Sequence, residues 1–326
     1  MSAYGPIADT DWIAVDWGTS SLRVWAVGRD GRVLAKAASQ DGMGTLAPDG
    51  YEHALLKLAG SFLPDNPERP VPVVVCGMAG AKQAWTEAAY RAVPCEPVAA
   101  GQMMPVPTRD PRLSVSIVPG LCQMTPANVM RGEETQLAGL VSRLGAVDAT
   151  VCMPGTHSKW VQLEAGRVAS FSTFMTGELF AVISADTILC KTIAAQGEDR
   201  EAFLGAVNEM LDNPGGLTGA LFSVRAGALL TGLDGAAARS RLSGLLIGAE
   251  LAATRAQWAR RTVHLVGSGP LAEAYSVALE SAGAKPVQED AEALTLAGLA
   301  QVRGLMSRTI PRDKTQRLPR RLSERT

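Results

Sequence analysis

The sequence is poor in the features that mark secreted, membrane and metal-stapled proteins. Its five cysteines are an odd number and lie far apart, with no Cys-x-x-Cys pair (Cys76, Cys95, Cys122, Cys152, Cys190). This pattern argues against a disulfide framework or a structural zinc site and fits a reducing compartment. No uncharged apolar run reaches the ~18 residues that a membrane helix needs. The segment MSAYGPIADTDW lacks the basic and apolar parts of a signal peptide. We therefore expect a cytoplasmic protein.

An excess of either charge is also absent, since 31 Lys and Arg residues face 32 Asp and Glu residues. This balance gives no reason to expect nucleic acid or a membrane surface as a partner. The C-terminal segment 305–326 departs from the balance because it is rich in Lys and Arg, and we expect it to be a flexible tail. The Walker A and Gly-x-Ser-x-Gly patterns are missing too, which disfavours a P-loop ATPase and a serine hydrolase.

What the sequence does contain is an alternating apolar run that ends on a carboxylate and a loop of hydroxyls. In AVDWGTSSLRVW, a predicted strand ends near Asp16, Gly18-Thr19-Ser20 lie in a loop, and a second strand follows. Glycine lets the backbone approach a ligand closely, while hydroxyls and successive N–H groups supply donors for phosphate oxygens. Asp16 would hold Mg²⁺ through its waters, because Mg²⁺ takes few protein ligands beside substrate phosphate. An ordinary surface turn is the alternative interpretation of this loop alone.

The same pattern recurs further along the chain. GTHSKWVQLEAGRV (155–168) echoes the first loop and its hairpin, and a strand-like run, ATVCMP, precedes it. The residues of this second loop are Gly155, Thr156 and His157. Two such loops favour a nucleotide site over two unrelated turns. Pro154 replaces the aspartate in the second copy, which leaves Asp16 as the metal candidate. His157 would contact phosphate or cap its own loop.

The repeat predicts an α/β protein of two related lobes, residues 1–127 and 128–304, each opening with a strand, a Gly-Thr loop and a β-hairpin. Glu133 and Glu134 follow Arg131-Gly132 at the start of a predicted helix. Acids at that place complement the helix dipole. Phosphoryl transfer to a hydroxyl also needs a carboxylate that orients the acceptor and takes its proton. A helix-start acid between two phosphate loops is therefore a candidate base.

A further glycine motif lies between a predicted strand and helix near the end of the chain. The stretch GSGPLA, which begins with Gly267, Ser268 and Gly269, matches the Gly-x-Gly-x-x-Ala dinucleotide fingerprint. Glu289 follows at about the distance of a ribose-binding acid. A dinucleotide fold needs further strand–helix units after that acid, whereas here one helix and the basic tail remain. The architecture therefore disfavours a dehydrogenase, and we expect these glycines to lie against an adenine nucleotide.

Together these stretches resemble the 2-dehydro-3-deoxygalactonokinase family over nearly the whole chain, within the superfamily of actin- and hexokinase-like ATPases. The motifs that carry the resemblance are VDWGTSSLR (15–23), IVPGLC (117–122), NVMRGEETQL (128–137), MPGTHSKWV (153–161), FMTGEL (174–179), LFSVRA (221–226) and LSGLLIGAE (242–250). The first is a superfamily signal, whereas RGEETQ, PGTHSKW and LSGLLIGAE in this order are much more specific. The resemblance implies two ribonuclease-H-like lobes with ATP in the cleft between them.

The activity that the resemblance implies is ATP-dependent phosphorylation of 2-dehydro-3-deoxy-D-galactonate at its 6-hydroxyl, a step of galactonate catabolism, with Mg²⁺ as cofactor. The partners would be this small sugar acid and ATP, without nucleic acid or membrane, and a homodimer is compatible with the sequence. The carried-over residues are Asp16, Gly18, Thr19 and Ser20 for the first phosphate loop and metal site, Gly155, Thr156 and His157 for the second loop, and Gly267, Ser268 and Gly269 for the adenosine motif.

Several sugar kinases of this superfamily use the aspartate of a Gly-Asp-Gln stretch as the base, and Gly132-Glu133-Glu134 would occupy that place here. Glu133 is the favoured base, with Glu134 and Asp16 as rivals. The carboxylate of the keto-acid substrate should attract a cation or backbone donors. The candidates for substrate binding are Lys82, Arg131 and Lys159, with Trp85 packing on the sugar.

Alternatives remain open at this point. Each of the three cations would otherwise be a solvated surface charge, and Trp85 would otherwise be a core residue. Another kinase of the same fold, acting on a different sugar acid or an amino sugar, fits the same motifs. A non-catalytic ATP-dependent sensor also fits the two phosphate loops.

Overall fold

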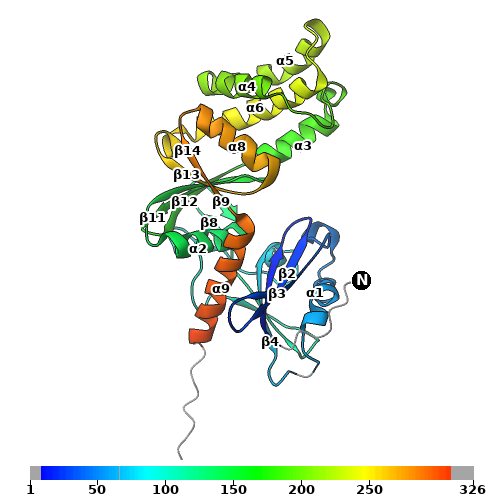
Figure 1. Ribbon diagram of the computed structural model, residues 1–326, viewed down its shortest axis with the longest axis vertical. Coiled ribbons are helices and arrows are strands. Elements are labelled where there is room, and N and C mark those ends of the chain that lie inside the picture. The colour runs from blue at the N-terminus through cyan, green and yellow to red at the C-terminus, as the bar shows by residue number, and fades with distance from the viewer. Residues whose placement is uncertain (1–8, 66, 310–326) are drawn as a thin grey trace, which may run out of the picture.

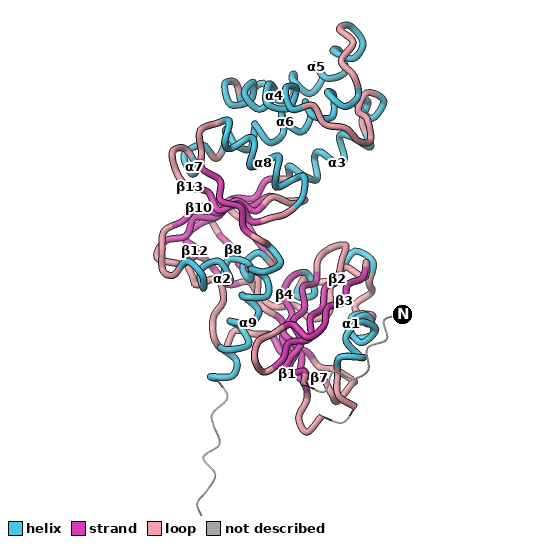
Figure 2. Tube along the Cα trace, in the orientation of Figure 1, coloured by secondary structure: helices cyan, strands magenta, loops and turns pink. Residues whose placement is uncertain are grey.

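The computed structural model describes residues 9–65 and 67–309, arranged around two mixed β-sheets that lie apart in the molecule (Figures 1 and 2). The first sheet has the strand order β3-β2-β1-β4-β7-β6. Its strands are β1 (Thr10–Trp17), β2 (Leu22–Gly28), β3 (Val33–Ser39), β4 (Val71–Gly77), β6 (Met104–Val106) and β7 (Leu113–Ile117). β1 pairs antiparallel with β2 and parallel with β4, and β4 pairs parallel with β7. The strand, loop and β-hairpin predicted around the first Gly-Thr loop, within residues 12–38, are confirmed.

The second sheet repeats this arrangement in the order β12-β11-β10-β13-β14. Its strands are β10 (Ala149–Met153), β11 (Ser158–Glu164), β12 (Arg167–Phe174), β13 (Thr262–Val266) and β14 (Lys285–Glu289). β10 is antiparallel to β11 and parallel to β13, as β1 is to β2 and β4. The two sheets therefore confirm the α/β fold with two related lobes that the sequence repeat predicts.

A third, small sheet is formed by short strands from segments that connect the strands of the two large sheets in the chain. It contains β5 (Arg91–Ala92), β8 (Leu121–Gln123) and β9 (Asn128–Met130). The side chain of Gln123 accepts the backbone N–H of Phe171 at 3.0 Å, and Thr173 donates to Asn128 at 2.7 Å, so this sheet lies against β12. The lobe boundary at 127/128 falls in the turn between β8 and β9 and stays a prediction.

Helices cover both sheets (Figure 1). They are α1 (Tyr51–Ala59), α2 (Glu133–Leu144), α3 (Thr176–Asp186), α4 (Arg200–Asp212), α5 (Leu217–Leu230), α6 (Gly235–Ala253), α7 (Arg255–Trp258), α8 (Gly269–Ser281) and α9 (Ala291–Thr309). α1 packs on the first sheet, while α4, α6 and α8 pack on the second. α2 and α9 lie together between the sheets. The basic segment predicted from residue 305 begins inside α9, and 310–326 lie outside the described residues.

α2 and α9 touch each other at backbone distance because glycine faces the partner helix at two points. A methyl group on Gly139 would lie 2.1 Å from the Leu294 carbonyl oxygen, and one on Gly298 would lie 1.9 Å from that of Thr135. Both glycines therefore leave no room for a side chain. This contact packs α2, which follows the strands of the first sheet in the chain, against α9, the last helix that the structure describes.

Strand alternation decides which side chains of β1 face this helix pair. Successive side chains point to opposite faces of a sheet. Ile13, Val15 and Trp17 belong to the core under α1, whereas Trp12 and Ala14 share a core with α2 and α9. Asp16 has the same parity as Trp12 and Ala14, so its carboxylate is directed to the α2 side of the sheet.

Helix α6 begins at Gly235, because the Asp234 carboxylate accepts the N–H groups of Ala236 and Ala237 as an N-cap, and it ends at Ala253. The proline-rich stretch 94–119 contains β7, which pairs along the buried β4. Prolines flank this strand, and its own residues, LSVSI, are free of them.

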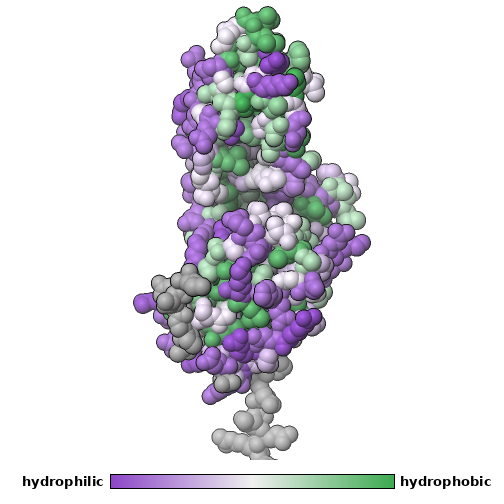
Figure 3. All heavy atoms as spheres, turned by 90° about the vertical axis from the view of Figure 1, so that its right-hand side faces the viewer, coloured by the Kyte–Doolittle hydropathy of each residue, from purple (hydrophilic) through white to green (hydrophobic). Residues whose placement is uncertain are grey.

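The surface of the helical end is partly apolar. Figure 3 shows apolar side chains at the end of the molecule that α5 forms. Phe222, Leu229 and Leu230 are all exposed there. Among the helices in residues 9–65 and 67–309, none combines the length and hydrophobicity that a membrane span requires.

Candidate active site

The ends of β1 and β4 meet the start of α2, and two glycines make this approach possible. Trp17 pairs with Gly77 in the parallel ladder, and a methyl group on Gly77 would lie 2.4 Å from the Trp17 carbonyl oxygen. Gly132 precedes α2 and has a φ of 104°. It lies against Gly77, because a methyl group on Gly132 would stand 3.4 Å from the Gly77 Cα. This contact brings the acids at the start of α2 close to Asp16.

Asp16 is a largely desolvated carboxylate at the end of β1. Its side chain is 14% exposed, and its Oδ2 lies 2.6 Å from an Arg23 guanidinium nitrogen on β2. Its Oδ1 has only the Cys76 thiol at 3.8 Å. Burial raises the pKa of Asp16 and Arg23 opposes that rise. The carboxylate therefore keeps one oxygen without a strong partner.

Glu133 joins this cluster to the second lobe. Its Oε1 lies 3.1 Å from the Nζ of Lys159, and its Oε2 accepts the Arg131 backbone N–H at 3.0 Å. Lys159 is 5% exposed and also donates to the His157 carbonyl in the second Gly-Thr loop at 3.0 Å. Glu133 is thus a partly exposed carboxylate held between α2 and the second loop.

Glu134 has a different environment from its neighbour. It is fully buried, and it accepts the Gly132 N–H at 2.7 Å and the Thr135 hydroxyl at 3.1 Å. Burial, followed by the charge of Glu133, raises the pKa of Glu134 to about 8. The side chain is therefore a mainly neutral carboxyl near pH 7, closed off from any ligand.

Arg131 carries donors that the protein does not satisfy. One terminal nitrogen donates to the Ala88 carbonyl at 2.7 Å, and the guanidinium lies over the Tyr90 ring at 4.4 Å. Its Nε and Nη1 are buried without a hydrogen-bond partner. Unpaired buried donors are costly, so these two groups are suited to an anionic ligand.

The first Gly-Thr loop rests on the segment 42–44. The Gly18 and Thr19 carbonyls accept the N–H groups of Met43 and Gly44 at 3.1 and 2.8 Å. A methyl group on Gly42 would lie 2.4 Å from the Thr19 carbonyl oxygen. Thr19 and Ser20 themselves are exposed. The loop is therefore fixed through its backbone while its side chains stay free to bind.

The second Gly-Thr loop rests on the start of α3. A methyl group on Gly177 would lie 2.3 Å from the Gly155 carbonyl oxygen, and the Glu178 N–H donates to the Thr156 carbonyl at 2.9 Å. The Glu178 carboxylate also lies 2.6 Å from the His157 ring. This arrangement leaves the Thr156 and His157 side chains exposed at the loop tip.

A cavity of about 580 Å³ opens beside this second loop. Gly155 and Thr156 line one part, and Pro270, Leu271 and Ala274 of α8 line another. Phe180 and Ile247 add apolar surface. Gly267 lies against Pro154, since its Cβ would stand 3.8 Å from the proline ring, so the predicted adenosine motif Gly267-Ser268-Gly269 adjoins the phosphate loop. The stretch GSGPLA thus reaches the cavity through Pro270 and Leu271, while Gly267, Ser268 and Gly269 do not line it.

Glu289, the acid that a dinucleotide fingerprint would need, is engaged elsewhere. Its carboxylate is buried and pairs with Arg143 of α2 and with His264 of β13, the latter at 2.8 Å. It is therefore not free to bind a ribose hydroxyl.

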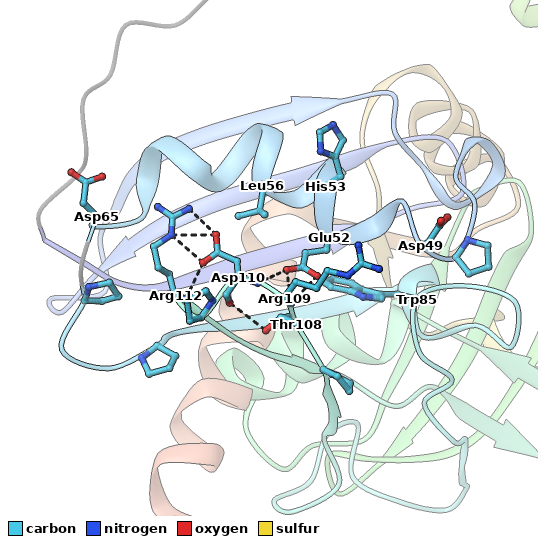
Figure 4. Close-up of a pocket in the computed structure, with 15 residues that line it drawn as sticks. Asp49, Glu52, His53, Leu56, Asp65, Trp85, Thr108, Arg109, Asp110 and Arg112 are labelled. Carbon is cyan, nitrogen blue, oxygen red and sulfur yellow. Dashed lines mark hydrogen bonds and ion pairs between the residues drawn. The ribbon is translucent and has the colours of Figure 1, made fainter.

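Lys82 and Trp85 follow Gly80, which lies against the Arg131 guanidinium. Lys82 is exposed beyond the short turn 78–80. Trp85 stacks on Tyr51, with ring centroids 6.1 Å apart, and lines a separate surface cavity of about 960 Å³ beside α1 (Figure 4). In that cavity Glu52 accepts backbone N–H groups of the 107–112 segment, and Asp110 pairs with Arg112. None of Asp16, Arg131 and Glu133 lines it.

Sequence reasoning missed Glu250 as an individual residue. It is 2% exposed in the apolar helix α6, below the second loop, and accepts the Trp160 indole N–H at 2.8 Å and the Ser158 hydroxyl at 2.9 Å. The sequence feature that could have identified Glu250 is its place as the one carboxylate at the end of the apolar motif LSGLLIGAE. A charge in such a run needs buried partners.

The described residues contain no gathering of three or more His, Cys, Asp or Glu side chains that would hold a metal by protein ligands alone. Mg²⁺ does not require one, since it is usually bound through one or two carboxylates, waters and substrate phosphates. A single desolvated carboxylate with one free oxygen, as at Asp16, fits that mode.

Comparison with known proteins gives a consistent result. The profile of the 2-keto-3-deoxy-galactonokinase family matches residues 16–302. A Rhizobium meliloti (strain 1021) protein described as "Probable 2-dehydro-3-deoxygalactonokinase" is 46% identical over 296 residues, which cover 89% of this chain and 95% of the relative. The 2-dehydro-3-deoxygalactonokinase of Escherichia coli (strain K12) is 34% identical over 221 residues, 67% of this chain and 72% of the relative. A crystal structure from Sinorhizobium meliloti, titled for the same activity, aligns with a TM-score of 0.82 at 46% identity and covers 89% of this chain and 97% of its own.

Proposed function

The chain belongs to the 2-keto-3-deoxy-galactonokinase family, and we propose that it transfers the γ-phosphoryl group of ATP to the 6-hydroxyl of 2-dehydro-3-deoxy-D-galactonate, a step of galactonate catabolism. The observation that carries the mechanism is the meeting of three elements at the start of α2. Asp16 comes from the first lobe, Glu133 from α2, and Lys159 from the strand that follows the second Gly-Thr loop.

ATP would bind with its base in the 580 Å³ cavity and its phosphates at the loops. The apolar wall of Phe180, Ile247 and Leu271 suits a planar base, and the Gly267 motif adjoins it. The second loop would supply backbone N–H groups and the Thr156 hydroxyl to the phosphates. Thr19 and Ser20 would supply equivalent donors from the first lobe when the lobes close, while Gly18, whose N–H donates to the Ser21 carbonyl at 2.8 Å, would shape the loop.

Asp16 would hold Mg²⁺ between the two loops. Its unpaired oxygen and its desolvation both favour a nearby cation, and its partner Arg23 keeps the carboxylate oriented. When bound, Mg²⁺ neutralises charge on the transferring phosphoryl group.

Glu133 is the base that the geometry favours among the three carboxyls. Its side chain is 24% exposed, whereas Glu134 is fully buried and Asp16, at 14%, is assigned to the metal. Glu133 accepts the proton of the 6-hydroxyl as that oxygen bonds to the γ-phosphorus. The bond from phosphorus to the β–γ bridging oxygen breaks, and ADP leaves with the electron pair.

Arg131 would bind the substrate carboxylate if a movement of the site exposes its two unpartnered donors, which are buried. Because Nε–H and Nη1 point in different directions, a carboxylate would accept from one of them, and that fixed direction orients the acceptor as well as attracting it. Lys159 would hold Glu133 and add positive charge beside the phosphates. Lys82 and Trp85 would contact the sugar from the segment that follows Gly80, which lies against Arg131.

The test is ADP release measured with 2-dehydro-3-deoxy-galactonate and its gluconate epimer side by side. We expect turnover with the galacto acceptor, and Glu133→Gln should lower kcat roughly 10²–10⁴-fold. Glu164→Gln, an exposed acid on β11, is the matched control and should leave kcat unchanged. Preference for the gluco acceptor or an amino sugar would assign another substrate. ADP release that does not depend on an acceptor would favour the ATP-dependent sensor. An unchanged kcat in Glu133→Gln would show that Glu133 is not the base.

A further inference from the structure

The carboxylate of Glu250 forms a buried hydrogen-bond centre beneath the second Gly-Thr loop. Its Oε2 accepts the hydroxyls of Ser158 at 2.9 Å and Tyr275 at 2.7 Å, together with that of Thr176. Its Oε1 accepts the Trp160 indole N–H at 2.8 Å. The oxygens are thus satisfied by four side-chain donors while the residue is 2% exposed.

All four donors are neutral, which is unusual for a buried carboxylate. Buried charges are normally paired with an opposite charge or a metal. Among the ion pairs formed by the described residues, none includes Glu250. The charge is therefore stabilised only by dipoles that must all point at it, so each donor is fixed in direction by the carboxylate.

The donors come from β11, α3 and α8, and α3 and α8 also line the cavity that we assign to ATP. Ser158 directly follows the second loop, and strand alternation sends it and Trp160 to the α6 face while Lys159 faces α2. Thr176 begins α3, whose next residue touches the Gly155 carbonyl. Tyr275 lies in α8, the helix that follows the Gly267 motif.

We propose that Glu250 is a positioning residue that fixes the second phosphate loop relative to α8, so that ATP is held at its phosphate and adenosine ends together. This inference rests on the proposed nucleotide site. Glu250 does not touch the ligand itself. It acts through Ser158 and Thr176 on the loop side and through Tyr275 on the adenosine side.

Glu250→Gln is the informative substitution because it preserves shape and removes the charge. The Trp160 indole can only donate, so the amide oxygen must face it. The amide nitrogen then replaces Oε2, and the three hydroxyls lose their common acceptor. We expect the Kd for ATP to rise about tenfold or more, because several hydrogen bonds to an ionised group are lost. The Kd for adenosine should stay within about twofold, since adenosine makes no phosphate contact.

The experiment measures ATP and adenosine binding by calorimetry with the full chain, together with kcat and the KM values for ATP and the sugar acid. Glu289→Gln is the matched control, because Glu289 is a buried carboxylate of the same lobe whose side chain contacts Arg143 and His264. It should lower thermal stability and leave the Kd for ATP unchanged. The KM for the sugar acid should not move in either variant.

Tyr275→Phe provides a second variant that keeps the carboxylate and removes one donor. It should raise the Kd for ATP by a smaller factor than Glu250→Gln and leave the Kd for adenosine unchanged. In the double variant, the loss of ATP binding free energy should be less than the sum of the two single losses. If Glu250→Gln does not fold, Tyr275→Phe alone carries the test. Equal losses for ATP and adenosine, or no loss for either, would overturn the positioning role. Failure of the unsubstituted protein to bind ATP would instead overturn the proposed nucleotide site.

Discussion

The two strand–loop–strand units share one scaffold and differ in what stands at the strand end. In the first, Asp16 lies opposite Arg23, and in the second, Met153 lies opposite Lys159. Asp16 and Met153 each lie two positions before the glycine of their loop. Met153, and not Pro154 as the sequence comparison suggested, therefore stands in the place of the aspartate. Arg23 therefore pairs within its own sheet, while Lys159 has no acid opposite and reaches Glu133 at the start of α2. The cation that follows each loop therefore has a different partner in the two units.

The supports of the two loops differ as well. The first loop rests on backbone groups of 42–44, whereas the second rests on α3 and, underneath, on the side chain of Glu250. Both nevertheless need a glycine at the supporting contact, Gly42 in one case and Gly177 in the other. The same close approach of backbone is thus reached by two different segments.

The largest effect is expected from substitution of Asp16, the carboxylate that the first strand–loop–strand unit has and the second lacks. Asp16→Asn should lower kcat roughly 10²–10⁴-fold, because a neutral amide cannot replace the carboxylate at a magnesium site. Met153→Leu, at the equivalent position, should change kcat less than about twofold, since volume-conserving apolar swaps are tolerated. Steady-state ADP release and thermal melting measure both. Full activity in a folded Asp16→Asn protein would remove the metal assignment.

The next effect tests the supporting glycines. Gly177→Ala and Gly42→Ala place a methyl group within 2.4 Å of a backbone carbonyl, so each loop must shift. Overpacking of this kind costs about 1–3 kcal/mol, and we expect the KM for ATP to rise in both variants.

Gly205→Ala, on the exposed side of α4 with open space around it, is the control for these two variants. It should leave KM unchanged and stabilise the helix by up to about 1 kcal/mol. A normal KM in Gly177→Ala would show that α3 does not set the position of the second loop.

A smaller effect concerns Glu134, the buried acid in the first turn of α2. The pKa of Glu134 is raised from 4.5 to about 8 in the folded chain. Between these values the unfolded chain releases a proton that the folded chain keeps, so the free energy of unfolding falls as pH rises. Glu134→Gln cannot titrate and should gain stability relative to the unsubstituted protein from pH 5 to pH 8, measured by urea unfolding. Parallel pH profiles would contradict the raised pKa.

The smallest effect separates the two roles left open for His157. Its pair with Glu178 is exposed on both sides, and such pairs contribute about 0–1 kcal/mol. If His157 contacts phosphate, His157→Ala should raise the KM for ATP about two- to fivefold while Glu178→Gln does not. Equal effects of the two substitutions would assign His157 to loop capping alone.

Sequence patterns predicted the parts of the fold that have strong local signals. The β1–β3 hairpins, their echo at 155–168 and the helix that starts at Glu133 all follow from alternation, turn residues and helix-start acids. α3, α4 and α5 were not predicted as elements. α3 and α5 are apolar on several sides and show little period, whereas α4 carries a signal that was missed, because its buried Phe203, Ala206, Val207 and Met210 follow helical spacing. The order of strands, which places β7 beside β4, came from the fold and not from local sequence.

By itself the sequence determined the chemistry available, namely two Gly-Thr loops, a strand-end aspartate and paired acids at a helix start, because each is a local pattern of residue types. Only the tertiary structure decided how these groups divide the work. Glu133 and Glu134 are adjacent in sequence, yet helix geometry and packing leave one beside Lys159 and bury the other among backbone donors. The neutral donors around Glu250 come from β11, α3 and α8, and only the packing of those elements brings them to one carboxylate.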